Sequence, residues 1–133
     1  MLRKGSKLLM TVVATAAAFV GVLGMASPAS ASTTKVVTGT TTNGSAEATV
    51  TWDSSHVSVY GHTTDTVVDG YDVAMYGYYH FTDKTYGWAW LGDQNNAINS
   101  TEPASGAWLY VCRIAHTANH YDHGNAVNCN LMQ

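Results

Sequence analysis

The sequence predicts an all-β protein: an antiparallel β-sandwich of seven or eight short strands with one disulfide. Short runs rich in β-branched and aromatic residues alternate with turn signals of Gly, Asn, Asp and Ser at regular spacing. No segment after residue 31 has the periodicity of an amphipathic helix. Two cysteines follow an apparent export signal, as in disulfide-bonded secreted domains. We expect an immunoglobulin-like or jelly-roll-like arrangement, with a small β-barrel as the alternative.

Residues 1–31 have the features of a secretory signal peptide. These features are a positive start (Arg3, Lys4 and Lys7), an apolar run at 8–25 and an Ala-Ser-Ala cleavage site at 29–31. The apolar run is about long enough for a transmembrane anchor, but Pro28 and the small residues after it favour cleavage. We therefore expect a secreted, extracellular protein in which residues 32–133 form a single β domain.

The charge of this mature region restricts its partners. Three basic residues (Lys35, Lys84 and Arg113) stand against nine acidic residues, which gives a net charge of −6 over 102 residues. Since so few cations cannot neutralise many phosphates, nucleic acid is not expected as a partner. For the same reason we expect no membrane contact after signal cleavage.

The predicted strands are bounded by turn residues. They lie at 35–38, 46–52, 56–63, 71–81, 86–91, 97–101, 107–115 and 126–132. The turns and loops between them are expected at 39–45, 53–55, 64–70, 82–85, 92–96 and 102–106. The run 107–115 is apolar on both faces, as expected for a central strand between two packed layers.

The aromatic runs 71–81 and 86–91 are predicted to form a hairpin around a four-residue loop. This loop length places Tyr79 opposite Trp88 and Gly77 opposite Trp90. Because side chains alternate between faces, one face then carries most of the large rings and belongs to the core. The rings assigned to this core face are Tyr79, Phe81, Tyr86, Trp88 and Trp90. The opposite face, which carries Tyr76, Tyr78 and His80, is left for the surface or a partner.

Cys112 and Cys129 are predicted to form one structural disulfide. The sequence lacks the close CxxC-type spacing of redox pairs and metal thiolates. Closing a loop of this length stabilises a fold by about 3 kcal/mol in the chain-entropy model.

Three segments carry a resemblance to other proteins: Val-Ser-Val-Tyr-Gly at 57–61, Asp-Thr-Val-Val-Asp-Gly-Tyr-Asp-Val at 65–73, and Leu-Tyr-Val-Cys-Arg at 109–113 together with Cys129. In these segments the chain resembles a loose group of small secreted actinobacterial β-proteins without an assigned function. Its Ala- and Val-rich leader is similar to those of filamentous Gram-positive bacteria. The resemblance implies a stand-alone β-sandwich with a C-terminal disulfide, and it implies no activity.

The aromatic residues supply the first candidate site. Eight Tyr and four Trp exceed what a core of this size needs. Exposed rings of these types stack on sugars or anchor a protein partner. The residues that we expect to bind are Tyr76, Tyr78 and His80, with Tyr60 beside them. The alternative is that this face packs on a second sheet, with only tyrosine hydroxyls at its rim.

Three carboxylates in and after the 64–70 loop form a second candidate. Asp65, Asp69 and Asp72 offer oxygen ligands that suit Ca²⁺, although the EF-hand pattern is absent. The alternative is turn chemistry, in which Asp side chains bond nearby backbone amides.

Three histidines in the loop that the disulfide would close form a third candidate. His116, His120 and His123 offer imidazoles that suit Zn²⁺ or Cu²⁺. The alternative is a polar, solvent-facing loop that is rich in histidine.

The sequence gives little support for catalysis, since it contains neither a GxSxG nucleophile elbow nor an HExxH motif. Hydrolysis by paired carboxylates stays open, because it depends on their separation in space. The expected function is non-catalytic binding or coating at the cell exterior, with a polysaccharide, the cell envelope or a secreted protein as partner. The alternatives are an enzyme inhibitor or toxin-like protein that presents the 102–106 loop or the disulfide loop, and an extracellular metal-binding protein. No cofactor is expected apart from the metal ions named above.

Overall fold

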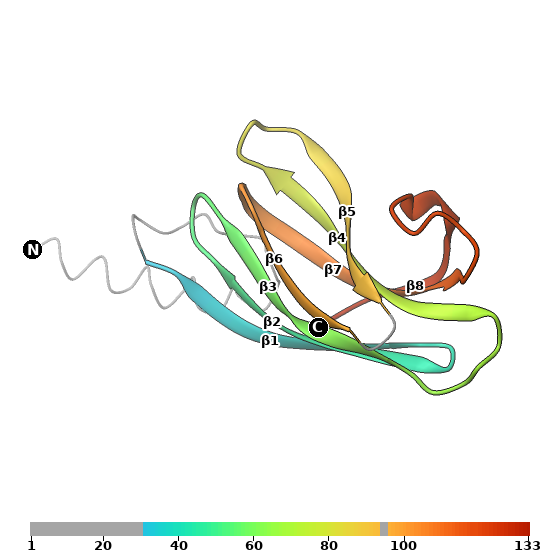
Figure 1. Cartoon of the computed structure of the whole chain (residues 1–133). Helices are drawn as coiled ribbons and strands as arrows, with labels where there is room; N and C mark the ends of the chain where they lie inside the picture. Colours follow the sequence, from blue (N-terminus) through green and yellow to red (C-terminus); the bar gives the residue numbers. More distant parts are fainter. Residues whose placement is uncertain (1–30, 94–95) are drawn as a thin grey trace, which may run out of the picture.

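Two four-stranded antiparallel sheets pack face to face, as Figure 1 shows. The computed structural model describes residues 31–93 and 96–133. The strand order is β1-β2-β3-β6 in the first sheet and β5-β4-β7-β8 in the second, which confirms the predicted all-β sandwich. The predicted signal peptide lies, apart from residue 31, outside the described residues. Within the described ranges, no helix is long and apolar enough to cross a membrane.

The strands follow the predicted order along the chain. They are β1 (Thr33–Thr41), β2 (Gly44–Trp52), β3 (Val57–Asp65), β4 (Tyr71–Phe81), β5 (Tyr86–Asp93), β6 (Ala97–Glu102), β7 (Ala104–Ala115) and β8 (Ala126–Leu131). The loop predicted at 102–106 is wrong, because only Pro103 separates β6 from β7, where the chain passes between sheets. Proline cannot donate to a ladder, whereas the small residues after it pair with β4, with Ala104 opposite Phe81.

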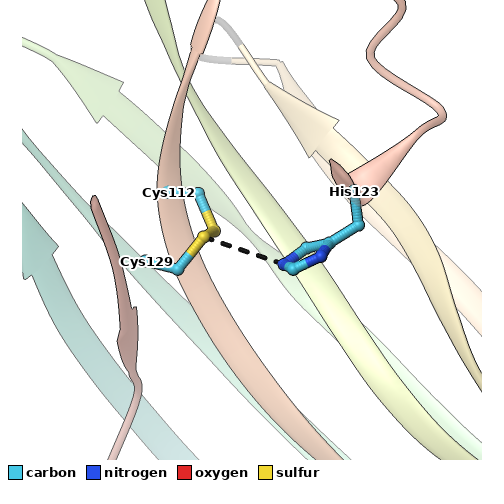
Figure 2. Close-up of side chains that lie close together, drawn as sticks. All are labelled: Cys112, His123 and Cys129. Carbon is cyan, nitrogen blue, oxygen red and sulfur yellow. Dashed lines mark hydrogen bonds between the residues drawn. A yellow bond between two sulfur atoms is a disulfide. The ribbon is translucent and has the colours of Figure 1, made fainter. Parts of the chain in front are cut away.

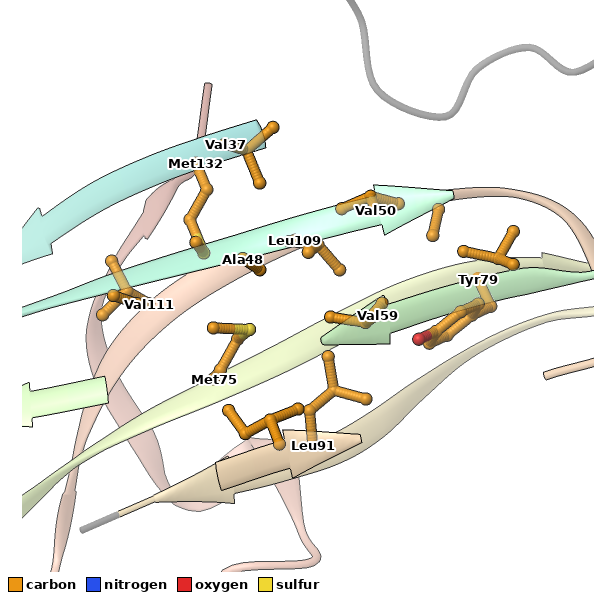
Figure 3. Packing of buried hydrophobic residues seen from close by; sticks show 14 of the residues in the cluster. Val37, Ala48, Val50, Val59, Met75, Tyr79, Leu91, Leu109, Val111 and Met132 are labelled. Atoms are coloured by element: carbon orange, nitrogen blue, oxygen red, sulfur yellow. The ribbon is translucent and has the colours of Figure 1, made fainter. Parts of the chain in front are cut away.

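The core lies between the sheets, where alternate residues of each strand point inward. Figure 3 shows its centre, which includes Val37, Ala48, Val50, Val59, Met75, Tyr79, Leu91, Leu109, Val111 and Met132. Burying each large side chain stabilises the fold by about 1.5–3 kcal/mol relative to exposure. The ring of Tyr79 covers Gly77, where an added Cβ would lie 2.5 Å from a ring carbon. The predicted pairing of Gly77 with Trp90 is wrong, because Gly77 lies opposite Ala89.

The predicted hairpin at 71–91 forms, but its register differs by one residue from the prediction. Trp88 lies opposite Tyr78, not opposite Tyr79. Tyr79 and Phe81 keep their predicted places against the core. On β5 the shift moves the large rings from the predicted core face to the outer face of the sheet, namely Tyr86, Trp88 and Trp90.

The turn between β4 and β5 explains the shift. It spans residues 81–85 and is closed by a hydrogen bond from the Phe81 amide to the Thr85 carbonyl (2.8 Å). Lys84 adopts a positive φ of 77°, and Asp83 accepts a hydrogen bond from the Thr85 amide. The connection therefore takes one more residue than a four-residue loop, and every later residue of β5 changes face.

The chain after β7 folds back over the outer face of the second sheet before it enters β8 (Figure 1). The predicted disulfide is confirmed, with Cys112 of β7 bonded to Cys129 of β8. The segment 116–125 lies between the two cysteines and ends with the 3-10 helix η2 (His123–Asn125). A second, smaller apolar cluster forms beneath this segment, around Ala74, Tyr76, Cys112 and Ile114.

Candidate functional site

The outer face of the second sheet carries a continuous set of aromatic side chains on β5, β4 and β7. Trp88, Tyr78 and Trp108 lie side by side in register across these three strands. Further aromatic residues precede and follow this row on the same face, because alternate residues of a strand share a face. We call the whole set the aromatic platform: Tyr78, His80, Tyr86, Trp88, Trp108 and Tyr110.

The rings of the platform contact one another. Tyr78 lies at the centre, and its ring centroid is 4.9 Å from that of Trp88, 5.9 Å from Tyr86 and 6.2 Å from Trp108. His80 stacks on Tyr86 at 4.5 Å, with the two planes 10° apart. Because neighbouring rings hold each other in place, a ligand bound here would cost little side-chain entropy.

The platform faces solvent. Tyr86 is 55% exposed and Trp88 is 40% exposed, while Tyr78, Trp108 and the other members are half-buried. Large rings gathered on one exposed face are a common feature of interaction surfaces, so we take the platform as the candidate binding site. Because the rings stand on a sheet, they offer a broad face and not a deep pocket.

Tyr76, which was predicted to bind together with Tyr78 and His80, does not reach the surface. It lies on the same face of β4 but is buried beneath the 116–125 segment. Its hydroxyl donates a hydrogen bond to the carbonyl oxygen of His120 at 2.7 Å. Burial, together with nearby carboxylates, raises the pKa of Tyr76 to about 12. Tyr76 therefore anchors the segment that covers it.

Tyr60 lies away from the platform. It is 63% exposed on β3, where it pairs with Thr49 and Asn99 of the first sheet. The expectation that Tyr60 lies beside Tyr78 is wrong, because the two residues belong to different sheets.

His123 extends the platform and does not join the other two histidines of its loop. Its ring stacks on Trp88, with centroids 3.5 Å apart and planes 4° apart. Its Nε2 lies 3.8 Å from Sγ of Cys129. Figure 2 shows the imidazole beside the disulfide. Burial lowers the pKa of His123 and so favours the neutral ring. The sulfur atoms of Cys112 and Cys129 are bonded to each other, so they do not offer thiolates to a metal beside this histidine.

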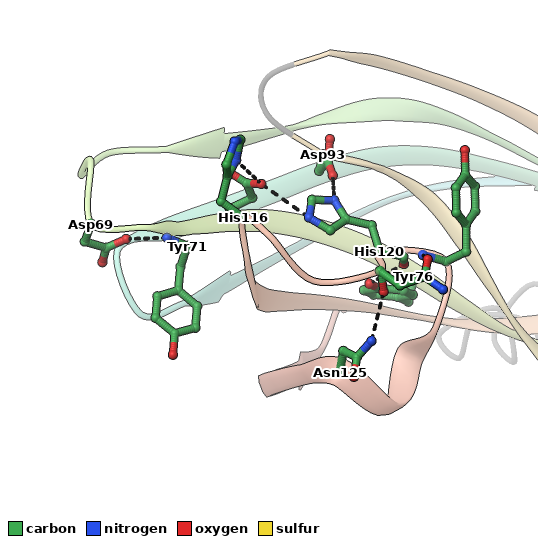
Figure 4. Close-up of polar contacts among 10 residues, drawn as sticks. Asp69, Tyr71, Tyr76, Asp93, His116, His120 and Asn125 are labelled. Carbon is green, nitrogen blue, oxygen red and sulfur yellow. Dashed lines mark hydrogen bonds and ion pairs between the residues drawn. The ribbon is translucent and has the colours of Figure 1, made fainter.

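A second group of polar side chains lies where the 116–125 segment meets β4 and β5. His120 stands between two carboxylates, with Nδ1 in short contact with Asp93 and Nε2 3.5 Å from Oδ2 of Asp72 (Figure 4). Nδ1 of His116 lies 3.1 Å from the same Oδ2 of Asp72. The side chains of Asp72 and Asp93 are each only 10% exposed. We call these four residues the His–Asp cluster.

A β-bulge brings Asp93 to this cluster. The pairing of β5 with β4 is regular up to Trp90, and the register then shifts. Leu91 is the extra residue of the bulge, and its side chain enters the core. Simple alternation from Trp90 would turn Asp93 into the core, whereas the bulge places it opposite Ala74 on the outer face. The predicted strand ended before this point, so the sequence prediction missed Asp93.

The three carboxylates predicted to bind Ca²⁺ have separate partners. Asp69 forms an ion pair with Arg113, and Asp65 accepts a hydrogen bond from the amide of Val67. Asp72 belongs to the His–Asp cluster. All three line one open pocket of about 410 Å³. Their contacts are nevertheless those of a turn, an ion pair and a histidine cluster.

The sequence prediction also missed four of the six platform residues. Trp108 and Tyr110 were visible as two rings spaced two residues apart in a predicted strand, a spacing that places both on one face. Tyr86 and Trp88 were noticed but assigned to the core, because the assumed loop was one residue too short.

No protein-family model matches the chain, and neither a curated protein nor a solved structure matches it.

Proposed function

We propose that this is a secreted, non-catalytic binding protein that holds a polysaccharide at the cell exterior against its aromatic platform. The observation that carries the proposal is the row of Trp88, Tyr78 and Trp108, in ring contact across three neighbouring strands on a solvent-facing side of the sandwich.

Sugar rings suit such a surface. The face of a pyranose ring presents C–H groups, which are apolar and slightly positive, and the face of an aromatic ring is electron-rich. A polysaccharide repeats this face along its length, so several rings can each contribute a small stacking energy. The indole N–H groups, the tyrosine hydroxyls and His80 can bond sugar hydroxyls at the edges of the rings.

The composition of the platform favours a polysaccharide over a protein partner. Its members are Tyr, Trp and His only, whereas the cores of protein interfaces also recruit Met and Arg. The net charge of −6 on residues 32–133 favours a neutral or amino-sugar polymer over an anionic one. The disulfide between Cys112 and Cys129 supports a location in an oxidising compartment, in agreement with the expected signal peptide.

Co-sedimentation with insoluble polysaccharides tests the proposal. The purified protein is mixed separately with cellulose, chitin and peptidoglycan, and the bound fraction is measured over a range of polysaccharide concentrations. We expect binding to at least one of the three. Trp88→Ala and Tyr86→Ala should each weaken it by about tenfold, because both remove exposed stacking area. Tyr60→Ala is the matched control, since it removes a ring that is at least as exposed from the other sheet.

Three results contradict the proposal. The first is no binding to any of the polysaccharides. The second is an equal loss of binding in Tyr60→Ala and Trp88→Ala. The third is wild-type binding by both platform variants when their melting temperatures show that they are folded.

A further inference from the structure

We propose that the His–Asp cluster binds one divalent transition-metal ion, with Asp72, His116 and His120 as ligands and Asp93 orienting His120. This set differs from both metal sets that the sequence suggested. It takes one carboxylate from the loop set and two imidazoles from the histidine set, and it adds Asp93, which only the bulge in β5 brings to this face. The proposal is independent of polysaccharide binding.

The contacts of His120 are those of a metal ligand held in one orientation. Its Nδ1 is in short contact with Oδ2 of Asp93, and because an ionised carboxylate only accepts, Nδ1 donates in this contact. Its Nε2 is buried and has no hydrogen-bond partner. A carboxylate that accepts from one ring nitrogen while the other carries a free lone pair is the usual outer partner of a metal-bound histidine. Nε2 of His120 lies 3.5 Å from Oδ2 of Asp72, beyond a normal hydrogen bond.

Two of the three separations between the proposed ligand atoms, both measured from Asp72, fit one small ion. Oδ2 of Asp72 lies 3.5 Å from Nε2 of His120 and 3.1 Å from Nδ1 of His116. Two ligands about 2.1 Å from a tetrahedral Zn²⁺ lie about 3.4 Å apart. One donor atom from each of Asp72, Asp93 and His120 also lies within 4.8 Å of the others. His116 lies outside that group, so its side chain, which is 65% exposed, has to move towards His120 to complete the ligand set.

The two buried carboxylates of the cluster favour binding of a cation. Asp72 and Asp93 are nine-tenths buried carboxylates that share one histidine between them. Buried charges are destabilising unless they are paired. Two ionised carboxylates carry two negative charges, which one divalent ion would balance.

The surroundings leave room for the ion to enter. An open pocket of about 400 Å³ reaches the cluster and is lined by Trp90, Asp93, Ala118, Tyr121 and both histidines. Water in this pocket can supply the remaining ligand. Two imidazoles with one carboxylate suit Zn²⁺, Cu²⁺ or Ni²⁺, whereas Ca²⁺ prefers a shell made of oxygen only.

A bound ion would fasten the 116–125 segment to β4. That segment carries His123, which stacks on Trp88 of the platform. The metal is therefore a structural ion in this proposal, and its binding should appear as an increase in stability.

Zinc titration of the full protein, purified without a polyhistidine tag and treated with a chelator, tests the inference. Isothermal titration calorimetry should give one Zn²⁺ per chain, and Zn²⁺ should raise the melting temperature. His116→Gln should weaken binding at least about tenfold without unfolding the protein, because the side chain is largely exposed. Asp93→Asn should weaken binding by about 10–100-fold, as expected when the partner of a ligating histidine is lost. His62→Gln and His123→Gln are matched controls outside the ligand set and should keep wild-type affinity.

Absence of Zn²⁺ binding by the wild-type protein would overturn the inference. So would wild-type affinity in His116→Gln and Asp93→Asn, or loss of binding in His123→Gln alone, which would place the ion beside the disulfide. An increase in melting temperature with Ca²⁺ but not with Zn²⁺ would also overturn it. Because His116→Gln is expected to fold normally, its affinity for Zn²⁺ decides the question even if Asp93→Asn, at a buried position, is unstable.

Discussion

The substitution Tyr76→Phe is expected to destabilise the fold by about 1–3 kcal/mol near pH 7. Tyr76 is fully buried, and its hydroxyl donates to the carbonyl oxygen of His120 at 2.7 Å. Phenylalanine fills the same space but deprives this carbonyl of its donor. The substitution therefore weakens the contact between the 116–125 segment and the outer face of the second sheet.

The same hydroxyl makes the wild-type protein sensitive to alkali. Burial raises the pKa of Tyr76 from 10.0 to about 12. The unfolded chain therefore loses this proton about two pH units before the folded chain does. The stability that the protonated Tyr76 hydroxyl contributes is complete below about pH 10 and is lost as the pH rises towards about 12. At pH 11 the loss from Tyr76 is about 1.4 kcal/mol. Burial also raises the pKa of Tyr79, but that contribution is common to both proteins and cancels.

Urea unfolding at pH 7 and pH 11, followed by tryptophan fluorescence, measures both effects. The difference in unfolding free energy between wild type and Tyr76→Phe should shrink by about 1.4 kcal/mol between the two pH values. Tyr60→Phe, at an exposed position, should have the unfolding free energy of the wild type at both pH values. The reasoning is refuted if Tyr76→Phe is as stable as the wild type at pH 7, or if the difference is the same at pH 11.

Three further outcomes are expected. Gly61→Ala should lower the free energy of unfolding in urea by about 1–3 kcal/mol, because the new Cβ would lie 2.2 Å from a carbonyl oxygen of β2. Gly87→Ala should lower it less, because the nearest atom to its new Cβ is a ring carbon at 3.3 Å. Equal losses of stability in the two variants would contradict this packing. Reducing the disulfide of Cys112 and Cys129 should lower the unfolding free energy by about 3 kcal/mol, and an unchanged urea midpoint in dithiothreitol would contradict this. Burial lowers the pKa of His123 below 6.5, so the unfolded chain takes up a proton at this ring before the folded chain does, and the free energy of unfolding should fall as the pH drops below about 6.5. His123→Phe should reduce that fall. A variant with the same pH profile of stability as the wild type would contradict this.

The sheets could be predicted from the sequence because the strands carry their own signals. Alternating runs such as 46–52, bounded by turn residues, point one face inward wherever they pair. The disulfide was predictable from an even cysteine count in a chain with an export signal. These features depend on local pattern, which survives small errors in strand boundaries.

The platform could not be predicted in full, because its composition depends on loop length to within one residue. The letters Thr-Asp-Lys-Thr do not reveal that Lys84 adopts a positive φ and lengthens the connection. This single residue decides whether Tyr86 and Trp88 face the core or the solvent. The bulge at Leu91 likewise decides which face of the sheet carries Asp93, and the local sequence does not predict it.

The histidine cluster depends on contacts between distant segments. His116 and His120 were grouped with His123 because the three are close in sequence. The chain instead turns His123 towards Trp88 and brings the other two to carboxylates of β4 and β5. Such pairings are set by how the disulfide-closed segment packs on the sheet, which sequence spacing does not encode.

The most direct test of the central claim is an NMR titration of the indole N–H signals with a soluble oligosaccharide of the polysaccharide that the protein sediments with. Trp88 and Trp108 lie on the platform, and Trp52 lies in the core between the sheets. We predict saturable shifts of the Trp88 and Trp108 signals, with the Trp52 signal unmoved. Unmoved signals from both platform indoles at saturating oligosaccharide would contradict the account.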